Sequence, residues 1–196
     1  MDKAKNYKYG IWLVPVELEK YKTEIFKTSH IPHITFICKI PSKQKAFRML
    51  KLLREYTHTT YAVKVENKPL DLNHISYDVK QDAYCMSNNC EYVDNNNIEL
   101  TNKSSYSWGH NASLTNYNYS NIVYWIKHIQ LECLIQGSIS NELHMSIEYE
   151  SNKDNLNMRP INGEDGDDII TLFKMVVADI NDDNPEMWRI LEENKQ

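Results

Sequence analysis

The order of apolar patterns along this chain limits its fold more than any other feature of the sequence. Six segments are rich in aromatic and β-branched residues or alternate apolar with polar residues, as strands do: 7–16, 31–40, 61–72, 143–149, 169–180 and 186–191. Two others, 42–56 and 120–135, place apolar residues at helical spacing, and Ser42 is a suitable N-cap for the first. Each half of the chain thus pairs one helix with several strands. We therefore expect an α+β fold in which two pseudo-symmetric antiparallel sheets form a central cleft, with helices packed outside.

The 196 residues fit a single domain over 1–196, long enough to bury a core without staples. The stretch 73–115 is polar and rich in Asn, with short strand-like pieces at 83–86, 91–93 and 98–100. We expect hairpins with an exposed loop there, and we interpret the stretch as an insertion into the domain. The segment 151–168, which contains Pro160, Gly163 and Gly166, predicts a mobile connection.

The net charge of −5 argues against a protein that coats duplex nucleic acid, because such binding needs a broad basic face. Basic residues do follow one face of the helix expected at 42–56; a solvated helix face is favoured there over a phosphate-steering patch. No apolar run approaches the ~18 residues that cross a bilayer, and the N-terminal residues are polar. We expect a cytoplasmic monomer with no membrane partner.

Four cysteines are present, and in a cytoplasmic protein they are expected to be reduced thiols. Cys85 and Cys90 have a spacing that zinc sites use, but no second close Cys/His pair accompanies them. We therefore expect no metal site and no cofactor.

Two copies of one short pattern carry the chemistry: His33-Ile34-Thr35 and His144-Met145-Ser146. In a strand, residues i and i+2 point to the same face, so each histidine shares a face with its hydroxyl partner. The pattern alone is weak, since His58-Thr59-Thr60 matches it by chance. The evidence is the repetition, in predicted strands of corresponding halves of the chain.

Two imidazoles and two hydroxyls suit attack on a phosphodiester. A neutral histidine can take a proton from the attacking water, and a protonated one can give a proton to the leaving oxygen. The ordinary histidine pKa of about 6.5 makes both states accessible near neutral pH. The hydroxyls can donate to the non-bridging phosphate oxygens, where charge builds in the transition state.

With these motifs the chain resembles the two-histidine (2H) phosphoesterases, and most closely their plant and yeast cyclic nucleotide phosphodiesterase branch. The first strand carries aromatic residues followed by Pro15, and Pro32 precedes the first motif. The second motif is followed by Tyr149, and a C-terminal hairpin carries Trp188. The resemblance covers most strands but not the stretch 73–115.

The resemblance implies metal-independent opening of a 2′,3′-cyclic phosphate, or of a related cyclic or 2′-5′ linkage, to a monoester. It implies that His144 activates water, that His33 protonates the leaving oxygen, and that Thr35 and Ser146 hold the phosphate; the residues alone do not order the histidine roles. The expected contacts to the base or sugar are Trp12, Tyr149 and Tyr9.

Several of these side chains have a second interpretation. Trp12 is equally compatible with core packing, and strict alternation puts Tyr149 off the His144 face unless a bulge intervenes. His30 fits a loop histidine better than a support for His33. Trp108-Gly109-His110 fits a surface turn better than a cap over the site.

Three functions fit this reading. The first is an enzyme acting on a cyclic phosphate of a nucleotide or RNA end. The second is a viral-type enzyme that degrades a signalling oligonucleotide, such as 2′-5′ oligoadenylate or a cyclic oligonucleotide, against host immunity. The third is a binding module for nucleotides or RNA ends without catalysis. In each case the partner is a nucleotide or a short oligonucleotide and not duplex DNA.

Overall fold

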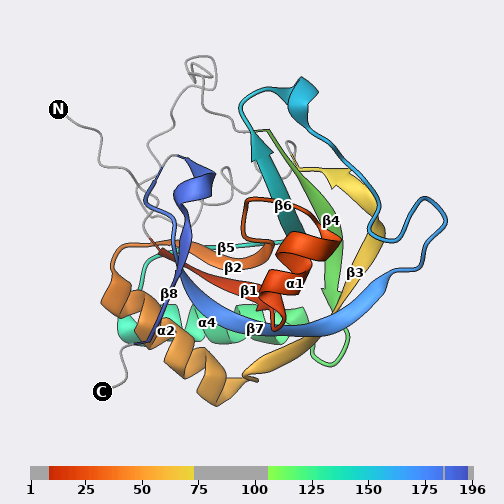
Figure 1. The fold of residues 1–196 in the computed structure, drawn as a ribbon. Helices are drawn as coiled ribbons and strands as arrows, with labels where there is room; N and C mark the ends of the chain where they lie inside the picture. The colour runs from red at the N-terminus through yellow and green to blue at the C-terminus, as the bar shows by residue number, and fades with distance from the viewer. Residues whose placement is uncertain (1–8, 73–105, 183, 194–196) are drawn as a thin grey trace, which may run out of the picture.

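A computed structural model describes residues 9–72, 106–182 and 184–193 (Figure 1). Its strands are β1 Tyr9–Pro15, β2 His33–Ile40, β3 Thr60–Asp71, β4 Tyr106–Leu114, β5 Ser138–Ile139, β6 His144–Glu150, β7 Ile169–Asp179 and β8 Arg189–Leu191. Its helices are α1 Leu18–Lys20, continued by a π-helical segment at Tyr21–Ile25, then α2 Lys43–Tyr56 and α4 Tyr119–Cys133. Short 3₁₀ turns lie at Lys153–Asn155 and Pro185–Met187. The predicted mixture of α and antiparallel β is confirmed.

The strands form one antiparallel sheet in the order β1-β2-β6-β4-β3-β7-β8. β7 also pairs with β1, so six strands close into a barrel, while β5 pairs with β2 beside it. The expected division into two pseudo-symmetric lobes with a cleft is not confirmed. Instead β2 and β6, which carry the two motifs, are neighbours in a single sheet.

Both long helices begin at side-chain N-caps, and the first of these is the predicted Ser42. The Ser42 side chain accepts a hydrogen bond from the Lys45 backbone N–H at 3.3 Å, and Asn118 accepts one from Ser120 at 2.9 Å. α2 and α4 lie together under β1, β2 and β7 in Figure 1. Their buried side chains join the main core with one set of alternating strand residues: Ala46, Met49, Leu50, Leu53, Ile122, Ile126 and Ile129 from the helices, and residues such as Ile11, Ile34, Phe36, Met145 and Ile147 from the strands.

A second, smaller core lies on the other side of β1 and β7. Trp12 and Val14 from β1 pack there with Val176 and Ala178 from β7, and Trp188 covers them. The alternation along each strand therefore serves two cores. The first motif has its histidine and hydroxyl on the side of this second core, because Trp12 pairs with Thr35 across β1 and β2.

The end of the difficult stretch 73–115 forms β4, which lies between β3 and β6 in the sheet. The rest of that stretch, with its predicted strand-like pieces and Cys85 and Cys90, lies outside the described residues. The surface turn expected at Trp108-Gly109-His110 is wrong, since Trp108 and His110 are fully buried within β4. A polar and Asn-rich composition concealed a strand that two neighbouring strands stabilise.

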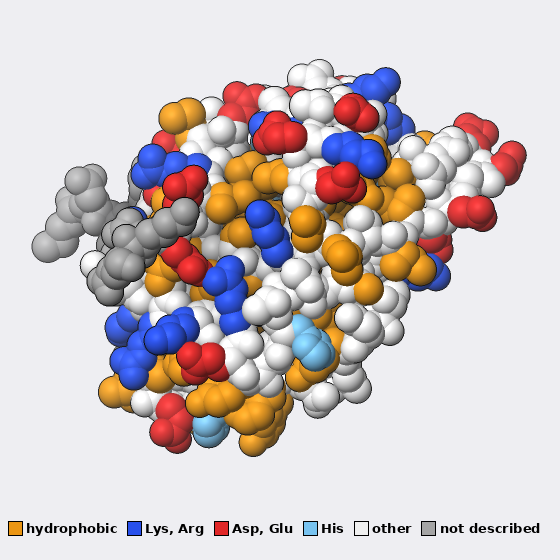
Figure 2. Space-filling view, turned by 60° about the horizontal axis from the view of Figure 1, so that its bottom comes forward, with side chains coloured by type: hydrophobic (Ala, Val, Ile, Leu, Met, Phe, Trp, Pro, Cys, Tyr) orange, Lys and Arg blue, Asp and Glu red, His pale blue; other side chains and the backbone are white. Residues whose placement is uncertain are grey.

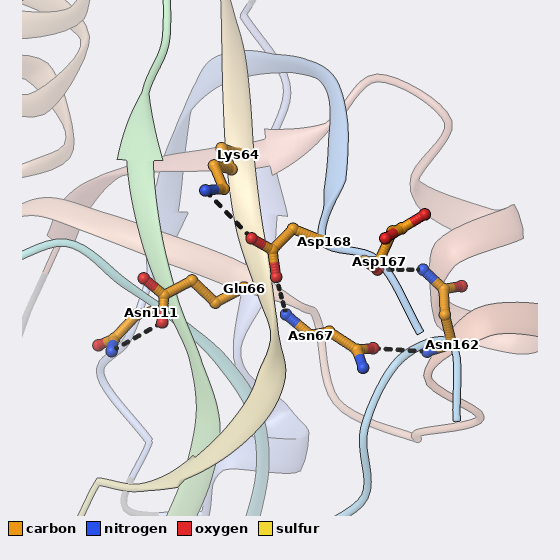
Figure 3. Close-up of polar contacts among 7 residues, drawn as sticks. All are labelled: Lys64, Glu66, Asn67, Asn111, Asn162, Asp167 and Asp168. Carbon is orange, nitrogen blue, oxygen red and sulfur yellow. Dashed lines mark hydrogen bonds and ion pairs between the residues drawn. The ribbon is translucent and has the colours of Figure 1, made fainter. Parts of the chain in front are cut away.

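One further expectation needs correction. The strand predicted at 186–191 is limited to β8, because Asn184 caps a 3₁₀ turn by accepting a hydrogen bond from the Glu186 N–H. The segment 151–168, predicted to be a mobile connection, contains the 3₁₀ turn at Lys153–Asn155 and is hydrogen-bonded to β3 through Asn67 (Figure 3). Asn67 is buried, and its side chain accepts from the Asn162 N–H at 2.7 Å and donates to the Gly163 carbonyl at 2.8 Å. Its backbone N–H donates to Asp168 Oδ1.

The basic residues of α2 take part in contacts within the protein. Lys45 donates to the Leu134 carbonyl, and Arg54 donates to Glu193 and to the Met175 carbonyl. Figure 2 shows Lys and Arg interspersed with acidic and hydrophobic side chains on the side of the molecule that it presents. In the described part of the chain, no helix is long and apolar enough to cross a membrane.

Candidate active site

The two motifs lie side by side on β2 and β6. His33 pairs directly with Ser146, and the same register puts Thr35 opposite His144. Paired side chains of antiparallel strands point to one face, with Cβ atoms about 4.5–5.5 Å apart. The two imidazoles and two hydroxyls therefore form one patch, in which each histidine lies beside the hydroxyl of the other motif.

His33 is held in a defined orientation and is only 3% exposed. Its Nδ1 lies 2.7 Å from the Ile31 carbonyl oxygen, and a carbonyl can only accept, so neutral His33 carries its proton on Nδ1. Its ring stacks on Trp12 at 3.7 Å between centroids and 12° between planes. Nε2 is thereby left as the atom that can exchange a proton.

Trp12 takes a supporting position in this arrangement. It is 1% exposed, and one face of its ring is covered by His33. Such a ring is not open to a base. Tyr9, the other candidate on β1, packs against the main core and is not brought to the His33 face.

Tyr149 does reach the site. β6 is bulged against β4: Ser146 pairs with Gly109 and Glu148 with Trp108, so Ile147 is the extra residue. The bulge changes the alternation and brings the Tyr149 hydroxyl to 3.4 Å from His33 Nε2. The bulge that Tyr149 needs in order to reach the face of the motif residues is therefore present.

Trp188 and His30 complete the surroundings of His33. The Trp188 ring meets Tyr149 at 5.1 Å and His33 at 6.3 Å, both edge to face. His30, expected to be a loop histidine, is 6% exposed and lies 5.6 Å from the Tyr149 ring. The Thr28 hydroxyl accepts from the His30 N–H and donates to the Ile147 carbonyl, which fastens this segment to the bulge. Only the spacing of His30 three residues before His33 hinted at this.

His144 lies on the more open side of the patch. It is partly exposed, and its β4 neighbour in register is Asn111, which is exposed. Burial lowers the pKa of His144, and the Glu142 backbone opposes this in part, as the Ile31 carbonyl does for His33. Nδ1 of His144 is nevertheless buried without a hydrogen bond of ordinary geometry to any described residue.

Burial lowers the pKa of both motif histidines. The pKa of His33 falls to about 3 and that of His144 to about 4, chiefly because the charged imidazolium loses its hydration. The two histidines are close enough that a positive charge on His144 lowers the pKa of His33 further. Burial also raises the pKa of Tyr149 to about 12, opposed by a hydrogen bond with Ser146. Both histidines are therefore neutral in the free protein at pH 7.

The low pKa of His33 predicts acid sensitivity. Between its unfolded pKa of 6.5 and its folded pKa of about 3, the unfolded chain binds a proton that the folded protein does not. Stability is therefore lost as the pH falls through this window, by about 1.4 kcal/mol per unit. In His33→Gln, the decrease in the free energy of unfolding from pH 7 to pH 5 should be smaller by about 2 kcal/mol, as measured by urea titration. An equal decrease in the variant would contradict the assignment of His33 as a buried neutral group.

No group of three or more His, Cys, Asp or Glu side chains in the described ranges is arranged to hold a metal ion. Cys38 and Cys133 are half-buried free thiols, and loss of hydration raises the pKa of Cys38 to about 11. No protein-family model, curated protein or solved structure matches this chain.

Proposed function

We propose that this protein is a metal-independent phosphodiesterase that opens a 2′,3′-cyclic phosphate, or a related cyclic or 2′-5′ linkage, by acid–base catalysis between His33 and His144. The observation that carries the proposal is the pairing of β2 with β6, which gathers both histidines and both hydroxyls into one patch. Diagonal neighbours on adjacent strands are about 7–8 Å apart, a separation that leaves room for one phosphate between the imidazoles.

The reaction uses each group once. The phosphate binds with its non-bridging oxygens on the Thr35 and Ser146 hydroxyls. His144 takes a proton from water as the water oxygen bonds to phosphorus, and protonated His33 gives its Nε2 proton to the ester oxygen as that P–O bond breaks. The product is a phosphate monoester with a free ribose hydroxyl. His144 as base and His33 as acid are the roles that the resemblance implies.

The fixed tautomer of His33 supports its role. Because Nδ1–H donates to the Ile31 carbonyl, Nε2 is the atom through which His33 exchanges a proton. Stacking on Trp12 holds the ring plane, so the direction of the Nε2 proton is set before the substrate binds. The Tyr149 hydroxyl lies beside Nε2 and Ser146, where it can donate to the sugar or the phosphate.

A substrate panel tests the proposal. The purified protein is given nucleoside 2′,3′-cyclic phosphates, 2′-5′ oligoadenylate and cyclic dinucleotides in the presence of a chelator, and products are separated by chromatography. Conversion of the cyclic phosphates to monoesters is the expected result. Preference for one of the oligonucleotides would instead select the enzyme that degrades a signalling molecule. Binding without turnover of any substrate would select the non-catalytic module.

The lowered histidine pKa values predict an unusual pH–rate profile. Catalysis as proposed needs His33 protonated and His144 neutral, and in the free protein the pKa of His33 is about 3 and that of His144 about 4. Above these values, the fraction of the protein in the required state falls about tenfold per pH unit. We expect log(kcat/KM) for a cyclic phosphate to decrease with a slope near −1 from pH 6 to pH 8. A profile that is flat or rises from pH 6 to pH 8 would contradict a reaction that begins with His33 protonated and His144 neutral.

A further inference from the structure

The site patch is closed at the His33 end. Trp12 covers one face of the His33 ring, the Tyr149 hydroxyl lies at Nε2, and Trp188 packs against both of these aromatic rings. These rings cover His33 at this end of the patch. Beyond them lie apolar residues of the second core from β1 and β7, followed on the same face of β7 by the exposed Lys174.

The patch is open at the His144 end. Asn111 on β4 is paired directly with His144, so the two side chains point to the same face. The Asn111 amide donates to Glu66 Oε2 on β3 at 3.3 Å, as Figure 3 shows. Asn111 and Glu66 are both exposed. A polar row therefore runs across the sheet from β2 through β6 and β4 to β3.

We propose that Asn111 and Glu66 bind the nucleoside part of the substrate while its phosphate lies between the histidines; this inference rests on the proposed function. The Asn111 amide, with one N–H on Glu66, keeps its oxygen and its second N–H for a ligand, and the Glu66 carboxylate accepts from an N–H or O–H donor. A ribose hydroxyl or a base amino group supplies the matching donors and acceptors.

Basic residues flank Glu66 along β3. Lys64, two residues before Glu66, has its ammonium paired with Asp168 Oδ2 at 3.1 Å (Figure 3). Lys68, two residues after Glu66, is exposed.

The first test compares two substrates of the same reaction. One is a nucleoside 2′,3′-cyclic phosphate, and the other is the cyclic phosphate of ethylene glycol, which has no nucleoside. In Asn111→Ala the ratio of kcat/KM for the first to that for the second should fall about tenfold or more, mainly through KM, because a hydrogen bond to the nucleoside is lost. Asn111→Ser, which keeps a polar group, guards against a folding defect and should lower the ratio less.

The second test removes the carboxylate. In Glu66→Ala the same ratio should also fall, because the nucleoside loses an acceptor and Asn111 loses its hydrogen-bond partner. Asn121→Ala and Glu132→Gln, exposed positions on α4, are the matched controls and should leave the ratio unchanged.

The outcomes separate the two claims. If the unaltered protein hydrolyses neither cyclic phosphate, the proposed function is overturned and the subsite with it. If it hydrolyses them but the Asn111 and Glu66 variants keep the original ratios, the nucleoside subsite is overturned and the two-histidine reaction stands.

Discussion

Gly109→Ala is expected to destabilise the protein by about 3 kcal/mol or more and to abolish hydrolysis. A Cβ atom at Gly109 would lie 1.8 Å from the carbonyl oxygen of Met145, the residue between His144 and Ser146. The obstacle is backbone, so relief requires β6 to move away from β4. That movement would displace the second motif from its register with His33. Urea unfolding gives the stability, and turnover of a cyclic phosphate gives the activity.

Ser113→Ala is the matched control for this prediction, because Ser113 is an exposed residue on the same strand. It should change the free energy of unfolding by less than about 0.5 kcal/mol. A Gly109→Ala protein with normal stability and normal turnover would contradict the close contact of β4 with β6 at the motif.

His33→Gln and His144→Gln should each lower kcat/KM for a cyclic phosphate by about 10²- to 10⁴-fold, the range that general acid–base catalysis supplies. Glutamine keeps polar atoms in a side chain of similar length but cannot exchange a proton. Steady-state kinetics on the purified variants measures the loss, and circular dichroism establishes that they are folded.

His58→Gln is the control for the two motif histidines. His58 begins a third match to the same pattern, but it is exposed and packs against Tyr61 and Tyr117, away from the site. Its replacement should leave kcat/KM within about twofold of the original value. A similar loss of kcat/KM in all three variants would contradict a site formed specifically by His33 and His144.

The sequence predicted the elements that carry the motifs because local patterns determine them. Ile34 and Phe36, and likewise Met145 and Ile147, are buried on one face in alternation with the motif residues, and Ser42 caps α2. Each of these signals lies within a few residues and requires no knowledge of the partner strand.

The arrangement of the strands could not be predicted in the same way. The pairing of β2 with β6 joins segments more than a hundred positions apart, and no local pattern states which strands are neighbours. β4 was concealed because Gly109, Asn111 and Ser113 give it a weak strand pattern; the close approach to β6 explains the glycine.

The surroundings of the histidines depended on the same long-range contacts. The bulge at Ile147 brings Tyr149 to His33, and the bulge is a property of the β4–β6 pair. Trp12, equally compatible with a substrate contact and with core packing, is a buried support for His33. Asn111 and Glu66 lie in line with His144 because β6, β4 and β3 are neighbours in the sheet, and a local pattern does not determine this order.

A double-mutant cycle on His33 and His144 tests the central claim most directly. The measurement is kcat/KM for a nucleoside 2′,3′-cyclic phosphate with the original protein, each single glutamine variant and the double variant. If the two imidazoles act as one acid–base pair, the double variant should be about as inactive as either single variant, since removing one partner already disables the pair. Losses that multiply, or activity that survives both substitutions, would contradict a shared catalytic site.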